Sequence, residues 1–182
     1  MATNIYDRCT NPVTGETFKA VSQTAYAFTI QWIAQPGDHR HLEHLHDYQD
    51  EIIHIKKGEA RVLIDGKEHI AGAGEKVIIT RGKSHVAFSN KNEELDAWVE
   101  YRPALDQERV YQCYNGLIND GYLDKNGSVN APMMCYMLKK MKCKAMARPA
   151  SIPAPAFKLA LNLYYLIGGL KGWDKLYEKY TK

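Results

Sequence analysis

The sequence lacks the patterns of disulfide-rich, membrane-spanning and DNA-reading proteins. Its four cysteines form no C-x-x-C pair and no dense framework, and its first residues contain no apolar signal region. The most apolar run, residues 156–170, contains Lys158 and Asn162 and is too short and too polar to span a bilayer. No helix-turn-helix is visible. We therefore expect a reduced, cytoplasmic protein with no transmembrane segment and no nucleic-acid partner.

The formal net charge of +3 hides an uneven distribution along the chain. Residues 1–102 carry 12 Lys/Arg against 15 Asp/Glu, whereas residues 103–182 carry 12 against 6. The basic run at residues 139–148 is interpreted as a solvated helix face, because no aromatic interleaving accompanies it. Hydrophobic residues make up 45% of the 182 residues, which is ordinary for a globular protein with one core.

All seven histidines lie between residues 39 and 85. His44 and His46 are two residues apart, so on an extended chain both imidazoles point to the same face. Glu51 and His85 each open a later β-like run, and we expect these four groups to come from three neighbouring strands. Three neutral imidazoles and one carboxylate suit a divalent first-row ion, with iron, manganese, nickel, cobalt and zinc all compatible.

The same stretch resembles the two signature motifs of the cupin superfamily. The positions that match the first motif are Gly37, His44, His46, Glu51 and Gly58, and those that match the second are Gly74, Gly82 and His85. Two positions depart from the second motif, with Thr80 where a proline is expected and Ser89 where an asparagine is expected. These departures affect the rigidity of turns and leave the ligand set intact.

The resemblance implies a mainly β fold: a small jelly-roll barrel over residues 1–102, followed by a C-terminal helical extension over residues 103–182. It also implies one divalent ion per chain, held by His44, His46, Glu51 and His85. The implied reaction is oxygenation, or isomerisation and cyclisation, of a small molecule, as in a dioxygenase-like oxidoreductase or an isomerase. A non-enzymatic module that binds a small ligand stays open as the alternative.

Several side chains near the expected ligands have a second interpretation. Gln49 shares the parity of Glu51, so both are candidate catalytic residues, Gln49 by hydrogen-bonding a ligand or taking a further coordination position. Asp50 and His54 point to the opposite face by strand alternation. His39 and His41, on the preceding loop, are candidates for contact with substrate or with the ligands. His69 lies beside a turn and is expected to be exposed.

Elsewhere the pattern predicts short strands and then helices. Strands are expected at residues 17–21, 25–34, 85–89 and 97–101, with the clearest hairpin at residues 60–71 around Asp65-Gly66. Phe28, Trp32, Phe88 and Trp98 are interpreted first as core residues. Helices are expected at residues 106–119, 131–146 and 156–170, the last weakened by Gly168 and Gly169.

The expected helices carry more apolar surface than a barrel of 102 residues would leave exposed. Val110, Met137 and Leu163 belong to apolar stripes on the three helices. We therefore expect the extension to pack on the barrel or on a partner, and the chain to form a homodimer.

Overall fold

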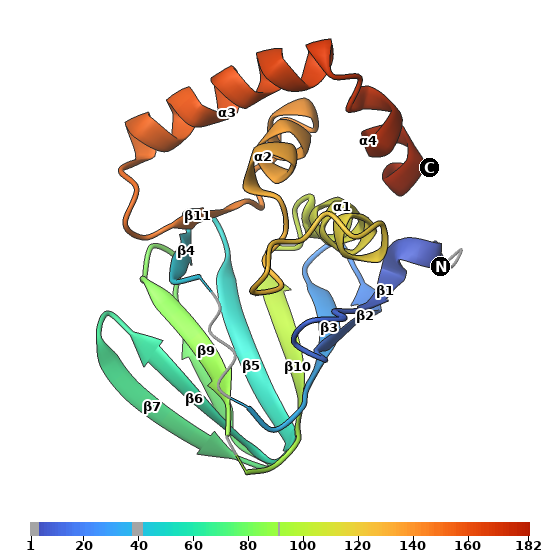
Figure 1. Cartoon of the computed structure of the whole chain (residues 1–182). Helices are drawn as coiled ribbons and strands as arrows, with labels where there is room; N and C mark the ends of the chain where they lie inside the picture. Colours follow the sequence, from blue (N-terminus) through green and yellow to red (C-terminus); the bar gives the residue numbers. More distant parts are fainter. Residues whose placement is uncertain (1–3, 38–41, 91) are drawn as a thin grey trace.

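The computed structural model describes residues 4–37, 42–90 and 92–182. Two antiparallel sheets face each other around a core, and the helices stack on one end of this barrel (Figure 1). This confirms the expected mainly β jelly roll with C-terminal helices. The expectations for His39 and His41 lie outside the described residues.

Within the described residues, one sheet has six strands and the other has five. The six-stranded sheet has the order β1 (Arg8–Thr10), β2 (Thr17–Gln23), β3 (Phe28–Ala34), β10 (Leu95–Arg102), β5 (Asp50–Lys57), β8 (Lys76–Ile79). The five-stranded sheet has the order β11 (Ala147–Pro149), β4 (His44–His46), β9 (His85–Ser89), β6 (Glu59–Ile64), β7 (Lys67–Gly72).

Strand alternation decides which side chains reach the core. Along β10, Leu95, Ala97, Val99 and Tyr101 are buried, and the residues between them face outward. Trp98 is one of these outward residues and is 39% exposed, so its assignment to the core is wrong. A regular period of two predicts a half-buried strand, and here it also identifies the buried face.

The hairpin between β6 and β7 forms where the sequence predicts it. Asp65 and Gly66 have φ values of 48° and 78°, and both values lie in the left-handed region that a two-residue type I′ turn needs. This turn pairs Ile64 with Lys67 and sets the register of the hairpin.

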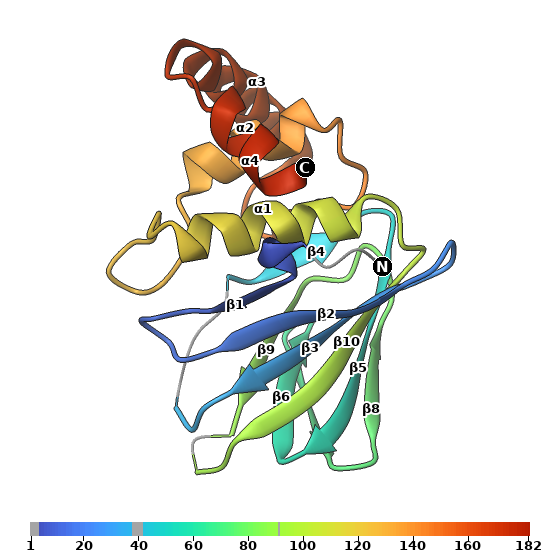
Figure 2. The same cartoon turned by 90° about the vertical axis from the view of Figure 1, so that its right-hand side faces the viewer.

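The helices lie in layers above one end of the barrel (Figures 1 and 2). In chain order, after the short 3-10 helix η1 (Ile5–Asp7), they are α1 (Gln107–Asn119), α2 (Ala131–Lys140), α3 (Ala154–Leu170) and α4 (Asp174–Thr181). A second hydrophobic cluster joins α1, α2 and α4, and a third joins the end of α2 to the start of α3. No helix in the described ranges has the length and apolarity that crossing a membrane requires.

The second helix ends six residues before the predicted residue 146. Met141 is the C-cap residue of this helix. Lys142 follows with a φ of 52°, a left-handed conformation that ends an α-helix. The amide of Cys143 then donates to the carbonyl of Leu138 at 3.1 Å, which closes the end of the helix. The chain then continues to β11, a strand that was not predicted from the sequence. Helix α4 was not predicted either.

Helix α3 begins two residues before the prediction, because Pro155 fits the first turn of a helix, where no backbone donor is needed. The helix ends at Leu170 as predicted, just after its two glycines. A Cβ atom on Gly168 would lie 2.2 Å from the ring of Tyr136, whereas one on Gly169 would meet nothing within 4 Å. Gly168 therefore lets α3 approach α2 closely.

We predict that Gly168→Ala destabilises the protein by about 1–3 kcal/mol, the usual cost of forcing an extra methyl group into a packed site. Gly169→Ala is the matched control. It should stabilise the protein by roughly 0.5–1 kcal/mol, because alanine is the better helix former and the added methyl group meets open space. Urea denaturation followed by circular dichroism measures both changes. Equal effects of the two substitutions would contradict the close packing of α3 on α2.

Candidate metal centre

The four predicted ligands meet at the inner face of the barrel. His44 and His46 lie on β4, and His85 opens the neighbouring strand β9, where it pairs directly with His44. Glu51 was expected on a strand next to these two. It lies instead on β5, in the opposite sheet. The expectation of three neighbouring strands is therefore corrected: Glu51 reaches across the barrel to two strands of the other sheet.

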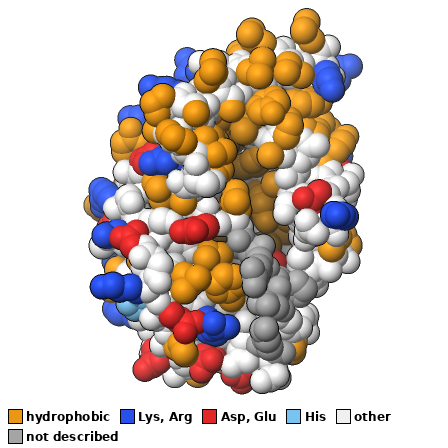
Figure 3. Space-filling view, turned by 60° about the vertical axis from the view of Figure 1, so that its left-hand side comes forward, with side chains coloured by type: hydrophobic (Ala, Val, Ile, Leu, Met, Phe, Trp, Pro, Cys, Tyr) orange, Lys and Arg blue, Asp and Glu red, His pale blue; other side chains and the backbone are white. Residues whose placement is uncertain are grey.

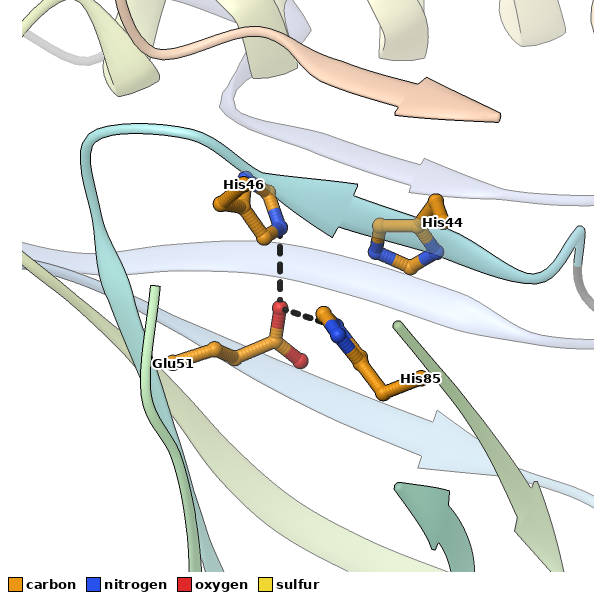
Figure 4. A group of neighbouring side chains, drawn as sticks. All are labelled: His44, His46, Glu51 and His85. Atoms are coloured by element: carbon orange, nitrogen blue, oxygen red, sulfur yellow. Dashed lines mark hydrogen bonds and ion pairs between the residues drawn. The ribbon is translucent and has the colours of Figure 1, made fainter. Parts of the chain in front are cut away.

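The four side chains are close enough to share one ion. One ligand atom from each residue lies within 4.8 Å of those of the other three. Glu51 Oε2 lies 3.1 Å from His46 Nε2 and 3.3 Å from His85 Nε2, and Figure 4 shows both contacts. The ring of His44 lies beside this group, with its centroid 4.4 Å from that of His85.

Backbone carbonyls orient two of the imidazoles. His44 Nδ1 lies 2.8 Å from the carbonyl oxygen of Leu42, and His85 Nδ1 lies 3.0 Å from that of Lys83. A carbonyl only accepts hydrogen bonds, so in both rings Nδ1 must be the donor, and Nε2 of the neutral ring presents its lone pair to the site. A hydrogen bond from the other ring nitrogen to a backbone carbonyl is typical of histidines that ligate a metal. It also means that His85 can donate from Nε2 to Glu51 only as an imidazolium.

The surroundings shift the pKa values of three of these residues. Burial lowers the pKa of His44 to about 4, although the charge of Glu51 opposes this, so the ring is neutral at pH 7. Burial acts against ionisation of Glu51, but hydrogen bonds from His46 and His85 hold its pKa well below the usual range. Burial alone would lower the pKa of His85, yet the hydrogen bond and charge of Glu51 raise it. An ionised carboxylate beside imidazole lone pairs is a donor set that suits a divalent cation.

A pair of tyrosines lies beside the candidate ligands, Tyr101 on β10 and Tyr111 on α1. The ring of Tyr101 lies 5.5 Å from that of His46, and its hydroxyl is 2.8 Å from the hydroxyl of Tyr111 on α1. Tyr101 also pairs with Glu51 in the register of β10 and β5. Neither tyrosine was among the site residues predicted from the sequence. The alternation of β10 was the pattern that could have identified Tyr101, whereas nothing local links Tyr111 to the site.

Gln49 lies just before β5 and is only 1% exposed. Its Nε2 donates to the backbone carbonyls of Pro103 at 2.9 Å and Ala104 at 3.2 Å. Its Oε1 is buried and has no hydrogen-bond partner within the described residues. Gln49 therefore ties the strand of Glu51 to the start of the helical region, and its catalytic role stays a prediction.

The other candidate side chains lie away from the four ligands. The carboxylate of Asp50 binds Arg81, with the closest contact at 2.9 Å to the backbone amide. The ring of His54 lies on the outer face of the sheet, 3.9 Å from Glu100. His69 is exposed on β7.

The segment that contains the four candidate ligands matches a known protein family. Residues 31–99, which include all four candidate ligands, match the family model of the cupin domain. Residues 31–99 form a cupin domain.

Similar proteins include a transcriptional regulator and several solved structures. This cupin is 32% identical over 94 residues to the uncharacterised HTH-type transcriptional regulator YdiP of Escherichia coli, a match that covers 49% of the chain and 29% of the regulator. KdgF from a Halomonas species is 18% identical, with a TM-score of 0.45 over 51% of this chain and 83% of its own. A double-stranded β-helix protein of Klebsiella pneumoniae is 22% identical, with a TM-score of 0.45 over 49% and 73%. The expected absence of a nucleic-acid partner stays a prediction.

We predict that replacing His44 and His46 together with alanine lowers affinity for divalent ions by more than about 100-fold. Losing only the hydrogen-bond partner of a ligand lowers metal affinity by roughly 10-fold to 100-fold, and this change removes two ligands. The barrel should stay folded, because β4 is only three residues long and its pairing with β9 and β11 uses the backbone. His54→Ala and His69→Ala serve as controls and should leave the affinity unchanged. Isothermal titration calorimetry with iron(II), manganese, nickel, cobalt and zinc measures the effect. Unchanged affinity in the double variant would contradict the ligand assignment.

Proposed function

We propose that this cupin binds one divalent ion through His44, His46, Glu51 and His85 and acts on a small molecule at that ion. The observation that carries the proposal is the contact between Glu51 Oε2 and the Nε2 atoms of His46 and His85, together with the carbonyls that direct Nε2 of His44 and His85 inward. The candidate ions are iron, manganese, nickel, cobalt and zinc. Elemental analysis of protein purified without added metal identifies the ion.

The proposed reaction is oxygenation, or isomerisation and cyclisation, of a small oxygen-rich or phenolic molecule. An ion in this site would supply Lewis acidity or, as iron(II), oxygen chemistry. Of the four side chains, His44 is the one that is not fully buried, so we infer that the substrate approaches from the His44 side. Tyr101 and Tyr111 place aromatic rings and a partly buried hydroxyl pair next to His46, which favours an aromatic or hydrophobic substrate.

In this proposal Glu51 is the residue that moves a proton. It is buried and ionised, and it lies beside two imidazoles that keep it in place. A carboxylate in this position can accept a proton from the substrate while the histidines hold the ion. Gln49 is the second candidate catalytic residue, by hydrogen-bonding a ligand or taking a further coordination position, because its buried Oε1 is an acceptor without a partner in the described structure.

A second candidate function is that of a non-enzymatic module that binds a small ligand. The observation that favours it is the similarity to part of a transcriptional regulator, in which the matched segment is 29% of the protein. In that reading the barrel holds the ligand, and the contacts of Tyr111 and β11 with the site pass its effect to the helices.

The proposal also includes the arrangement of the chain. We infer that residues 1–102 form the barrel unit, that residues 103–182 form an extension packed on it, and that the protein is a homodimer. Of the three expected stripes, Met137 is fully buried and Val110 packs on the third cluster within the chain. Leu163 is 52% exposed and supports association through the extension.

We predict that Glu51→Gln reduces turnover by about 100-fold to 10,000-fold, the usual contribution of a general acid or base. The ion should be retained at lower affinity, because the amide oxygen is a weak ligand without charge. Oxygen uptake by iron-loaded protein with catechols, diketones and diols measures turnover, and elemental analysis measures the ion. Glu100→Gln makes the same change on the outer face of the neighbouring strand and should leave both unchanged.

The outcomes separate the two functions. Full turnover in a Glu51→Gln variant that keeps its ion would exclude the proton-transfer role and make Gln49 the next residue to replace. Tight binding of a test compound without any turnover in the native protein would support the binding module instead.

A further inference from the structure

Helix α3 is apolar on two opposite faces. One face packs on the rest of the chain through Phe157, Leu161 and Gly168, which are all buried. These residues follow the spacing of a single helical stripe, because residues three and four apart share a face. The stripe on this face accounts for the packing of α3 on α2.

The opposite face carries a second stripe that nothing in the described structure covers. Its members are four leucines at i, i+4, i+7 and i+11. This stripe is offset from the buried one by two residues, which is about 200° around the helix. They are Leu159 (69% exposed), Leu163 (52%), Leu166 (68%) and Leu170 (91%). Figure 3 shows hydrophobic side chains gathered on the helical end of the molecule. A contiguous apolar surface of this kind marks an interaction site.

The spacing of the leucine stripe points to another helix as the partner. Steps of four, three and four residues are the a/d spacing with which helices pack side by side. The series also reads the same in both directions. A two-fold axis through the middle of an antiparallel pair therefore sets Leu159 against Leu170 of the second copy, and Leu163 against Leu166. An isologous contact needs this kind of self-complementary surface.

The charges on α3 favour a second copy over a charged partner or an anionic membrane. Lys158 is the single charged side chain among the 17 residues of the helix, and it lies about 100° around the helix from Leu159. The stripe is flanked by Asn162 and Gly169, which carry no charge and are small enough to let another helix approach. Helices that bind anionic membranes instead carry several Lys or Arg beside the apolar face.

We propose that a second copy of this chain covers the leucine stripe, with the two α3 helices antiparallel about a two-fold axis. This deepens the proposed homodimer, on which it rests, by naming the surface. A pair of 17-residue helices buries less area than a standard interface, so the expected dissociation constant is in the micromolar range.

Sedimentation velocity on the full chain between about 1 and 100 µM tests the proposal. The native protein should shift from monomer to dimer over this range, and Leu163→Glu with Leu166→Glu should stay monomeric throughout. Two controls should keep the native dimer: Lys158→Glu, on α3 but outside the stripe, and Ile70→Glu, on β7 at a position 57% exposed. Circular dichroism and metal content should be native in all variants, because every substituted side chain is exposed.

The outcomes distinguish the interface from the homodimer itself. A native protein that is monomeric at the highest concentration would overturn both. A dimer that survives the double leucine substitution would overturn the α3 interface and leave the homodimer in place. Flotation with vesicles of phosphatidylcholine and phosphatidylglycerol gives the third result: binding that depends on Leu163 and Leu166, in a protein that does not dimerise, would assign the stripe to a membrane surface. Loss of metal binding would bear on the metal centre alone.

Discussion

The site depends on one interaction, the contact of a buried carboxylate with imidazoles from the opposite sheet. Glu51 lies on β5, while His46 and His85 lie on strands of the other sheet. A buried charge is costly unless it is paired, so the two sheets must hold these groups within hydrogen-bond distance. A slip of one residue in any of these strands would turn its ligand to the other face. The register that pairs His44 with His85, and Glu51 with Tyr101, is therefore part of the site.

The helical part of the chain contacts the site at three places. Strand β11 pairs with β4, with Ala147 opposite His46 and Pro149 opposite His44. Tyr111 of α1 bonds to Tyr101, whose ring packs against that of His46. Gln49, next to β5, bonds to the carbonyls of Pro103 and Ala104. Each contact ties a ligand strand or its neighbour to the helices, so a change in how the helices pack would reach the metal centre.

The helices differ in how much of their apolar surface is buried within the chain. The stripes of α1 and α2 are used within the molecule, where Leu117, Tyr136 and Met137 are almost fully buried. Helix α3 is the outermost layer and packs on α2 through one face, and no described residue covers the leucines on its other face (Figure 1). Its exposed leucines follow from the layer order of the helices and not from their composition.

The sequence by itself identified the four side chains that the fold brings together as candidate ligands. It also determined the hairpin at Asp65-Gly66 and the first helix, because each of these depends on residues close together along the chain. Spacing of two residues orients His44 and His46, and an Asp-Gly pair supplies the positive φ values of its turn. Only the tertiary structure decided that Glu51 faces its partners from the opposite sheet and that β11 joins β4. Those features depend on pairing between residues up to about a hundred positions apart, and local periodicity contains no record of which strand lies opposite which.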